Sequence, residues 1–205
     1  SLTTSAVSIS GLDVWVHSKP HADSPAGGDV YFLSSCATGR ITRLLLADVS
    51  GHGPSAAATA STLRTLMQRF VNHLDQSAFV THMNKHFTAA NRANLFATAI
   101  VSTFFGPTAT LSLCNAGHPA PLHFSAKTNR WSLLQPVDPA ADDATNLPLG
   151  IDDLSRYENL SVTLALNDLV LCYSDALIES HHPDGSLLGQ QALLHLLNAL
   201  PTPPV

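Results

Sequence analysis

The 205-residue chain is poor in charged residues, which make up only 12% of it, about half the ~25% that is typical of soluble domains. Glutamate is especially scarce, because 13 of the 15 acidic residues are Asp and only two are Glu. Glu favours helices, whereas Asp favours turns, helix caps and hard-metal sites. The surface is therefore not built from salt-bridged helices, and some of the Asp residues need local explanations.

The chain also lacks the features of several classes of protein. Its ten Lys and Arg residues are spread along the sequence and its formal net charge is −5, which argues against a nucleic-acid-binding surface. No run of about 18 apolar residues could span a membrane, and no secretory signal sequence is recognisable. We therefore expect a cytoplasmic protein with no membrane span in this chain and no nucleic-acid partner.

Cysteine is rare as well. The three cysteines, Cys36, Cys114 and Cys172, are far apart and each lies in an apolar run. Their odd number and wide spacing argue against a disulfide framework or a CxxC zinc site. We expect three buried thiols in a reducing compartment.

The order of the strand and helix patterns predicts an α+β fold in a single domain, residues 1–205. Strands are expected at 12–17, 30–36, 41–48, 96–105, 110–114, 121–124, 131–134, 157–166 and 168–174. Helices are expected at 56–74, from the capping residue Asp75 to about 93, and at 189–200. The first three strands are joined by short turns and should form an antiparallel meander. The Pro-, Asp- and Ala-rich stretch 136–148 should be a surface loop.

Three Asp residues stand at the ends of apolar strand patterns. Asp29 follows two glycines in AGGDVYF, Asp48 ends the run LLLAD, and Asp175 ends DLVLCYSD. Carboxylates that are brought together from such positions repel each other unless cations compensate them. A pair of Mg²⁺ or Mn²⁺ ions held by Asp oxygens could polarise a phosphoryl group and supply a metal-bound hydroxide.

Local turn chemistry offers another explanation for each segment taken alone. Asp29 after two glycines is typical of a β-turn. The Gly-rich loop after Asp48 could be a strand-to-helix turn that Ser50 or Ser55 caps. Asp168 follows a turn and is expected to stabilise it.

Taken in order, six segments resemble the motifs of the metal-dependent (PPM-type) serine/threonine protein phosphatases, in their bacterial SpoIIE/RsbU branch. GGDVYF is similar to GGDxYD, LADVSGHGPSAA to ADVSGxGxxAA, and NLFATAIVSTF to an FxT strand. NAGHPAPL nearly repeats a string of the family, LPLGI is similar to its LG turn, and LNDLVLCYSDALIES to GDxLxLYTDGxxE. The matches extend from about residue 26 to residue 197 and cover most of the chain.

The resemblance implies an α-β-β-α sandwich of two antiparallel sheets flanked by helices, with a binuclear Mn²⁺ or Mg²⁺ site. Asp29 would hold one metal directly or through water, and Asp175 the other. Asp48 would bridge both metals, with the Val49 carbonyl as a further ligand. The implied reaction is hydrolysis of phosphoserine or phosphothreonine on a signalling protein, by a metal-bridging hydroxide. The implied partners are a phosphorylated anti-anti-sigma (STAS) protein as substrate, and a second copy of the chain or an attached sensory domain.

Three departures from the family pattern leave a second function open. Phe32 stands where the family has a second Asp, and Ala176 replaces the Gly after the metal-binding Asp. The family ends with a strand that carries an Asp-Asp pair, whereas this sequence stops at PTPPV. Either this sequence stops before that strand or the protein lacks it, and in the second case the second metal site is incomplete. The alternative is a degenerate, non-catalytic phosphatase-like module that binds a signalling partner.

Four histidines are candidates for proton transfer or for zinc binding. His52 and His118 lie within the ADVSGHG and NAGH motifs, where either could donate a proton to the leaving serine oxygen. A structural hydrogen bond is at least as good an explanation for both. His82 and His86 stand four residues apart on an expected helix, but HMNKH lacks the Glu of the zinc motif HExxH. We expect this pair to face solvent.

Overall fold

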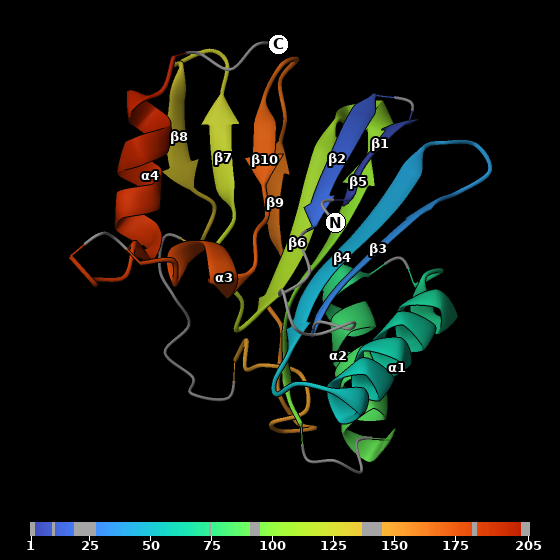
Figure 1. The fold of residues 1–205 in the computed structure, drawn as a ribbon. Helices are drawn as coiled ribbons and strands as arrows, with labels where there is room; N and C mark the ends of the chain where they lie inside the picture. The colour runs from blue at the N-terminus through green and yellow to red at the C-terminus, as the bar shows by residue number, and fades with distance from the viewer. Residues whose placement is uncertain are drawn as a thin grey trace.

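A five-stranded antiparallel sheet forms the centre of the molecule in the computed structural model, which describes residues 3–9, 11–18, 28–73, 75–90, 95–136, 145–181 and 184–201. The strand order is β3-β4-β5-β6-β9 (Figure 1). The strands are β3 (Asp29–Ser35), β4 (Ile41–Val49), β5 (Ala97–Phe105), β6 (Thr110–Ala116) and β9 (Leu160–Thr163). A one-turn 3-10 helix, η1 (Gly106–Thr108), lies between β5 and β6.

Helices α1 (Pro54–Phe70) and α2 (Gln76–Ala90) cover one face of this sheet (Figure 1). Alternate side chains of β4 point toward them, because successive residues of a strand face opposite sides. These residues are buried with the apolar stripes of both helices in the main core. As the sequence predicts, Asp75 caps α2, since its Oδ1 accepts a hydrogen bond from the Ala78 N–H at 2.7 Å.

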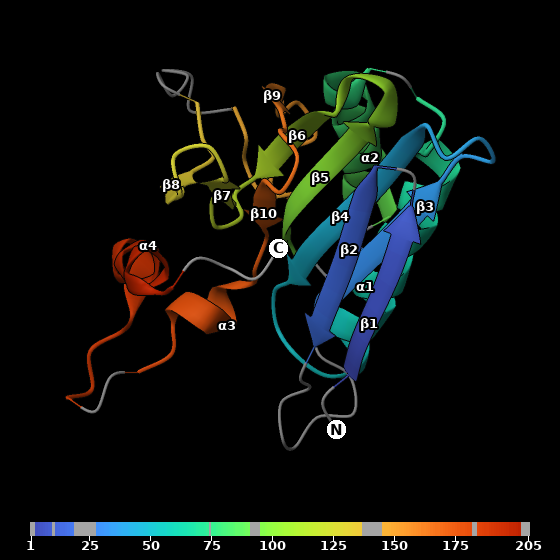
Figure 2. The same ribbon diagram turned by 90° about the horizontal axis from the view of Figure 1, so that it is seen from above.

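A second, three-stranded antiparallel sheet has the order β10-β7-β8. It consists of β7 (Leu122–Ser125), β8 (Arg130–Leu133) and β10 (Leu169–Leu171). Helix α4 (Gly189–Ala199) packs on it around Leu122, Tyr173 and Leu193. Seen from above, α4 and the pair α1 and α2 lie on opposite sides of the molecule (Figure 2). The two sheets with their outer helices form the expected α-β-β-α sandwich.

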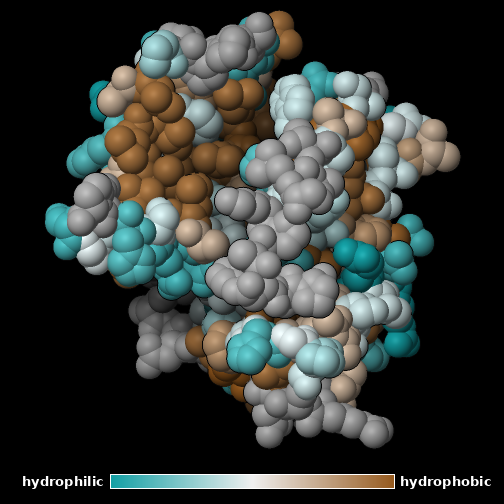
Figure 3. Space-filling view, viewed as in Figure 1, coloured by the Kyte–Doolittle hydropathy of each residue, from teal (hydrophilic) through white to brown (hydrophobic). Residues whose placement is uncertain are grey.

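Apolar side chains gather in two further regions, one between the layers and one on the surface. Phe104, Leu111 and Leu113 form a smaller cluster on the face of the large sheet that points away from α1 and α2. Apolar side chains also gather on the surface over α4, β7 and β8 (Figure 3), and Leu196 and Leu200 are more than half exposed there.

The first two strands differ from the expected meander. β1 (Thr3–Ile9) and β2 (Leu12–Ser18) pair with each other as a separate two-stranded sheet, and β2 is not paired with β3. The prediction of a meander from β2 through β4 is therefore wrong. The backbone of β2 pairs with β1, a strand that was not predicted from the sequence. β2 contacts the large sheet through side chains, with Leu12 packed against the cluster around Phe104.

The other predicted strands and helices are present, with shifted ends. β9 and β10 are shorter than expected, because Tyr157 and Tyr173 at the flanks are buried by side-chain packing rather than strand pairing. The expected loop 136–148 falls largely outside the described residues. None of the described helices is long and apolar enough to cross a membrane.

The prediction of three buried thiols is right for Cys114 and wrong for Cys36 and Cys172. Cys36 stands at the β3–β4 turn, where its Sγ accepts a hydrogen bond from the Ile41 N–H at 3.3 Å. Cys172 directly follows β10, which has a paired neighbour on only one side. Both positions leave the side chain open to solvent.

Candidate metal centre

Asp29 and Asp48 lie opposite each other at one end of the large sheet. β3 begins at Asp29 and β4 ends just after Asp48, and the antiparallel register pairs their Cα atoms. Paired residues of neighbouring strands point to the same face, with Cβ atoms about 5 Å apart. The two carboxylates that the sequence analysis singled out are therefore neighbours.

Gly28 brings the backbone before Asp29 close to the end of β4. The Gly28 carbonyl accepts a hydrogen bond from the Val49 N–H at 3.2 Å. A Cβ atom at position 28 would stand 2.4 Å from the Val49 carbonyl oxygen and 2.8 Å from Asp48 Oδ1. Only glycine fits this approach, and it leaves two hard oxygen donors side by side.

Asp175 comes to the same place from the other sheet. The chain leaves β10, passes Tyr173 and Ser174, and enters the short helix α3 (Asp175–Ile178). Ser174 Oγ donates a hydrogen bond to Asp29 Oδ2 at 3.2 Å, across 145 positions of sequence. This contact ties the segment that carries Asp175 to the start of β3.

The three carboxylates influence one another electrostatically. Burial, and then the nearby charges of Asp29 and Asp175, raise the pKa of Asp48 to about 7. Burial also raises the pKa of Asp29, although the hydrogen bond from Ser174 opposes that shift. Grouped carboxylates of this kind have a strong affinity for a cation, because a cation removes their mutual repulsion.

His118 is held between the two sheets by both ring nitrogens. It is 5% exposed, with Nδ1 2.8 Å from Thr98 Oγ1 and Nε2 3.0 Å from the Tyr173 carbonyl oxygen. A carbonyl only accepts, so Nε2 carries the proton and Nδ1 accepts from Thr98. Burial lowers the pKa of this imidazole, which favours the neutral ring. The geometry favours the structural explanation for His118.

The two ring contacts of His118 link the strand beside Asp48 to the segment that carries Asp175. Thr98 is the β5 partner of Asp48 in the sheet register, and Tyr173 stands two residues before Asp175. The NAGH loop that presents His118 is closed by two 2.8 Å hydrogen bonds between Asn115 and the His118 backbone. Thr98 and Ser174 were not predicted as site residues from the sequence, although both lie inside the motifs quoted above.

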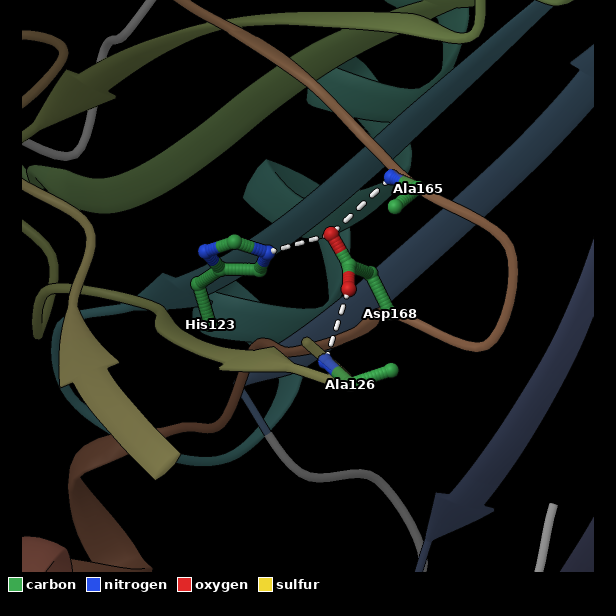
Figure 4. A network of polar contacts seen from close by, with 4 residues as sticks. All are labelled: His123, Ala126, Ala165 and Asp168. Atoms are coloured by element: carbon green, nitrogen blue, oxygen red, sulfur yellow. Dashed lines mark hydrogen bonds and ion pairs between the residues drawn. The ribbon is translucent and has the colours of Figure 1, made fainter. Parts of the chain in front are cut away.

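Asp168 stabilises the turn that leads into β10, as predicted (Figure 4). Its carboxylate accepts hydrogen bonds from the Ala165 and Ala126 N–H groups at 2.9 Å each, and from His123 Nε2 at 3.1 Å. Burial alone would raise the pKa of Asp168, but these hydrogen bonds outweigh it and lower the pKa. The network fixes β10, and with it the approach to Asp175.

The loop between β4 and α1 is shaped by backbone rather than by a serine cap. The residue before α1 is Gly53, and no side chain caps the helix. Ser50 Oγ instead accepts a hydrogen bond from the Phe96 N–H at 3.0 Å. The suggested cap by Ser50 or Ser55 is therefore wrong. His52 is exposed in this loop, directly beyond Asp48 and Val49.

His82 and His86 are exposed, as expected, and rest against Phe70, with ring-centroid distances of 6.2 Å and 5.0 Å. The His73 ring lies 5.1 Å from that of His82, a neighbour that the sequence spacing did not reveal. Within the described part of the chain, no three His, Cys, Asp or Glu side chains are arranged as the ligands of a single metal ion. The described histidines therefore form no such site. Asp29, Asp48 and Asp175 are neighbours, but their side chains are not arranged as three ligands of one ion.

The site nevertheless has the donor chemistry of a hard divalent cation. Mg²⁺ and Mn²⁺ prefer carboxylate and carbonyl oxygens. Gly28 has no side chain to cover the Asp48 carboxylate oxygen and the Val49 carbonyl oxygen, which both lie next to it. The residues present therefore fit such an ion.

Comparison with known proteins agrees with this arrangement. The model of the family described as Stage II sporulation protein E (SpoIIE) matches residues 38–205. The RsbU and RsbW domains of Rv1364c from Mycobacterium tuberculosis are 26% identical to this chain, with a TM-score of 0.70. That match covers 87% of this chain and 47% of the other, so the chain spans less than half the length of that relative.

Two more distant structures share the fold. The PP2C phosphatase domain of SpoIIE from Bacillus subtilis, solved with a fragment of its regulatory domain, is 18% identical with a TM-score of 0.63, covering 87% of this chain and 47% of that one. RsbX in complex with magnesium is 14% identical with a TM-score of 0.64, covering 81% of this chain and 75% of that one. Together with the family match over well more than half of the sequence, these likenesses show that the chain belongs to the SpoIIE family of PPM-type phosphatase domains.

Proposed function

We propose that the chain is a metal-dependent protein phosphatase that hydrolyses phosphoserine or phosphothreonine on a signalling protein, with an anti-anti-sigma (STAS) type regulator as the substrate. The observation that carries this proposal is the meeting of Asp29, Asp48 and Asp175, from two sheets, at one end of the large sheet. Family membership supports the reaction class. The phosphoprotein substrate is inferred from the resemblance to the RsbU branch.

The metal site is proposed to be binuclear. Asp29 and Asp175 would each hold one Mn²⁺ or Mg²⁺ ion, and Asp48 with the Val49 carbonyl would stand between the two. When bound, such ions offset charge on the phosphoryl oxygens and lower the pKa of a nucleophilic water. The magnesium in the related RsbX structure is consistent with this choice of metal.

The chain's own residues have separable roles in this proposal. Gly28 keeps the oxygens of Asp48 and Val49 accessible, and Ser174 orients the Asp29 carboxylate. His118 acts as a positioning residue, because it joins the β5 neighbour of Asp48 to the segment that carries Asp175. His52, exposed beside the site, is the candidate that donates a proton to the leaving serine oxygen.

A degenerate module that binds a phosphoprotein without hydrolysing it is the second candidate. The observation in its favour is Phe32, which stands where the family has an Asp and packs against the main core. That position is therefore apolar in this chain and supplies no ligand. The three remaining Asp residues favour the enzyme.

Metal-stimulated hydrolysis of an aryl phosphate distinguishes the two functions. The chain should hydrolyse p-nitrophenyl phosphate in the presence of Mn²⁺ and lose this activity with EDTA. Asp48→Asn should reduce kcat by about 100-fold or more, an effect of about 2.7 kcal/mol. Asp153→Asn changes an exposed Asp that is not one of the three proposed ligands and should leave kcat unchanged. Mn²⁺ binding without turnover would refute the enzyme and favour the binding module.

We further propose that residues 1–205 form one domain that works in the cytoplasm, as a homodimer or joined to a sensory domain. The Mycobacterium tuberculosis relative, in which RsbU and RsbW domains occur in one chain, supports a modular arrangement. Analytical ultracentrifugation of the chain tests the dimer.

A further inference from the structure

A cavity with several polar lining residues lies at the end of the large sheet that is far from Asp48. Its volume is about 410 Å³, within the range of about 300–1,000 Å³ in which proteins bind small molecules. It opens where the first turn of α2 meets the first residues of β4 and the last residues of β5. The polar residues that line it include Arg43, Gln76, Ser77, Thr103, Ser112 and Asn159.

Arg43 is a buried cation without a counter-ion in the described part of the chain. The residue is only 3% exposed. Its Nη1 donates to Thr103 Oγ1 at 2.9 Å and to Gln76 Oε1 at 3.3 Å, and its Nη2 donates to the His73 carbonyl. All three acceptors are neutral, and no described carboxylate forms an ion pair with the guanidinium.

Other contacts hold Arg43 in place but do not neutralise it. Its guanidinium carbon lies 5.0 Å from the centroid of the Phe79 ring, and its Nε has no hydrogen-bond partner among the described residues. Burial lowers the pKa of this side chain, yet a guanidinium stays protonated at neutral pH. A buried charge costs several kcal/mol unless an opposite charge compensates it.

The surroundings of Arg43 suit an anion. Ser112 and Asn159 place hydroxyl and amide groups on the cavity wall, whereas the hydroxyls of Ser77 and Thr103 already donate to the Tyr157 carbonyl and to Gln76 Oε1. The N-terminal turn of α2 also faces it, and the positive end of a helix dipole favours negative charge. The one carboxylate of the lining belongs to Asp75, which is exposed and caps α2 through the Ala78 N–H.

We propose that this cavity binds a small organic anion, a carboxylate or a phosphate, whose charge compensates that of Arg43. The site is separate from the proposed metal centre, because Arg43 and Thr103 stand at the opposite ends of β4 and β5 from Asp48 and Thr98. The proposal does not depend on phosphatase activity, and its test uses metal-free protein without substrate.

The test is a titration followed by two-dimensional ¹H–¹⁵N NMR in EDTA, with inorganic phosphate and succinate as separate probes. We expect at least one probe to shift the amide signals of Thr103, Ser112 and Asn159 saturably, with a Kd of about 1 mM or tighter, roughly −4 kcal/mol. Which probe binds decides between the phosphate and the carboxylate class.

Two substitutions at the cavity change its charge without removing Arg43. Asn159→Asp adds a carboxylate of the same size and should weaken binding by about tenfold or more, because like charges in a partly buried site repel by over 1 kcal/mol. Asp75→Asn removes one and should tighten binding by severalfold, while Asn still caps α2. The matched control is Asn129→Asp, an exposed position in the β7–β8 turn, which should leave the Kd within about twofold.

Three results would overturn the proposal. One is the absence of saturable shifts at these residues with either probe up to about 20 mM. Another is an unchanged Kd in Asn159→Asp. The third is that the shifts are confined to the Asp29, Asp48 and Asp175 end, which would place the anion at the metal centre instead.

Discussion

Asp29 and Asp48 face each other across the β3–β4 ladder, so two carboxylates share one end of one sheet. The hydrogen bond from the Val49 N–H to the Gly28 carbonyl and the close packing of Gly28 on Val49 fix this end of the ladder. The third carboxylate, Asp175, depends on a different set of contacts, which pass through Ser174, His118 and the small sheet. The proposed metal centre therefore needs the two sheets to keep their relative position, and each set of contacts can be tested separately.

The stability of the metal-free protein should fall as the pH rises. The pKa of Asp48 is about 7 in the folded protein against 3.8 for an ordinary Asp, so the folded state binds a proton that the unfolded state has lost. This contribution is fully present below about pH 4 and lost as the pH passes through about 7. Asp48→Asn removes the ionisation, and we expect a higher Tm than wild type at about pH 8, with a difference that shrinks toward pH 4.

The control for this measurement is Asp153→Asn, whose Tm should follow wild type at both ends of the range. Saturating Mn²⁺ should raise the Tm of the wild type and have little effect on Asp48→Asn, because a ligand that binds only the folded state stabilises it. A wild-type Tm that is higher at pH 8 than at pH 5 without metal would contradict the raised pKa of Asp48, which comes first from burial and then from the charges of Asp29 and Asp175.

Gly28→Ala should disturb the metal centre without changing any ligand. The added Cβ would stand 2.4 Å from the Val49 carbonyl oxygen, a backbone atom that cannot move independently. We expect a loss of about 1–3 kcal/mol in the free energy of unfolding and Mn²⁺ affinity weakened by about 10–100-fold, both measurable by denaturation and calorimetry. Gly185→Ala is the comparison, because a Cβ there meets no atom within 4 Å. It should cost about 1 kcal/mol from its backbone conformation alone and leave metal affinity intact.

The positions of Asp29 and Asp48 near strand ends were predictable from the sequence, because a carboxylate that borders an apolar run marks where a buried strand begins or ends. Asp175 was expected at the end of a strand over 168–174, but β10 ends at Leu171 and Asp175 begins α3. The α+β class and most helices and strands were predictable from the spacing of apolar residues along the chain. Local patterns could not show that β2 pairs with β1, since a strand's partner depends on contacts far apart in sequence. The exposure of Cys172 likewise depends on which strands flank β10.

The site's supporting residues were harder to infer. Thr98 and Ser174 are ordinary strand and turn residues until the two sheets come together, and only then does Ser174 reach Asp29. The burial of Arg43 without a counter-ion was also invisible, because a charged residue in a strand pattern normally faces water. Such features arise from packing between segments, which the spacing of residues along the chain does not record.

His118→Phe should separate positioning from proton transfer. The substitution keeps a buried ring but leaves the Thr98 hydroxyl and the Tyr173 carbonyl without their partner, at about 1–3 kcal/mol for each buried group. We expect a lower kcat with an unchanged shape of the pH–kcat profile, because His118 acts through Asp48 and Asp175. Loss of one limb of the profile would instead identify His118 as a general acid. His195→Phe, at an exposed position on α4, controls for the change of residue type.

His52→Gln tests the proton donor proposed beside the site. A serine alkoxide is a poor leaving group that needs protonation, whereas p-nitrophenolate leaves without help. The variant should therefore hydrolyse a phosphoserine peptide about 100-fold more slowly and keep near wild-type activity on p-nitrophenyl phosphate. Equal losses on both substrates would show that His52 supports the loop rather than the leaving group.

Asp168→Asn should weaken the small sheet, and through it the placement of Asp175. The Asp168 side chain is 5% exposed and accepts three hydrogen bonds, so the uncharged variant should lose about 1–3 kcal/mol of stability at neutral pH. Its pKa lies below the ordinary 3.8 in the folded protein. This stabilisation is therefore present above about pH 4 and lost as the pH falls through the folded pKa. Wild type should lose more stability than Asp168→Asn between about pH 4 and pH 2 in urea titrations. Asp184→Asn removes an exposed turn carboxylate that accepts hydrogen bonds from the Ser186 N–H and hydroxyl, and should change little. An equal effect of the two variants would show that the Asp168 network does not stabilise β10.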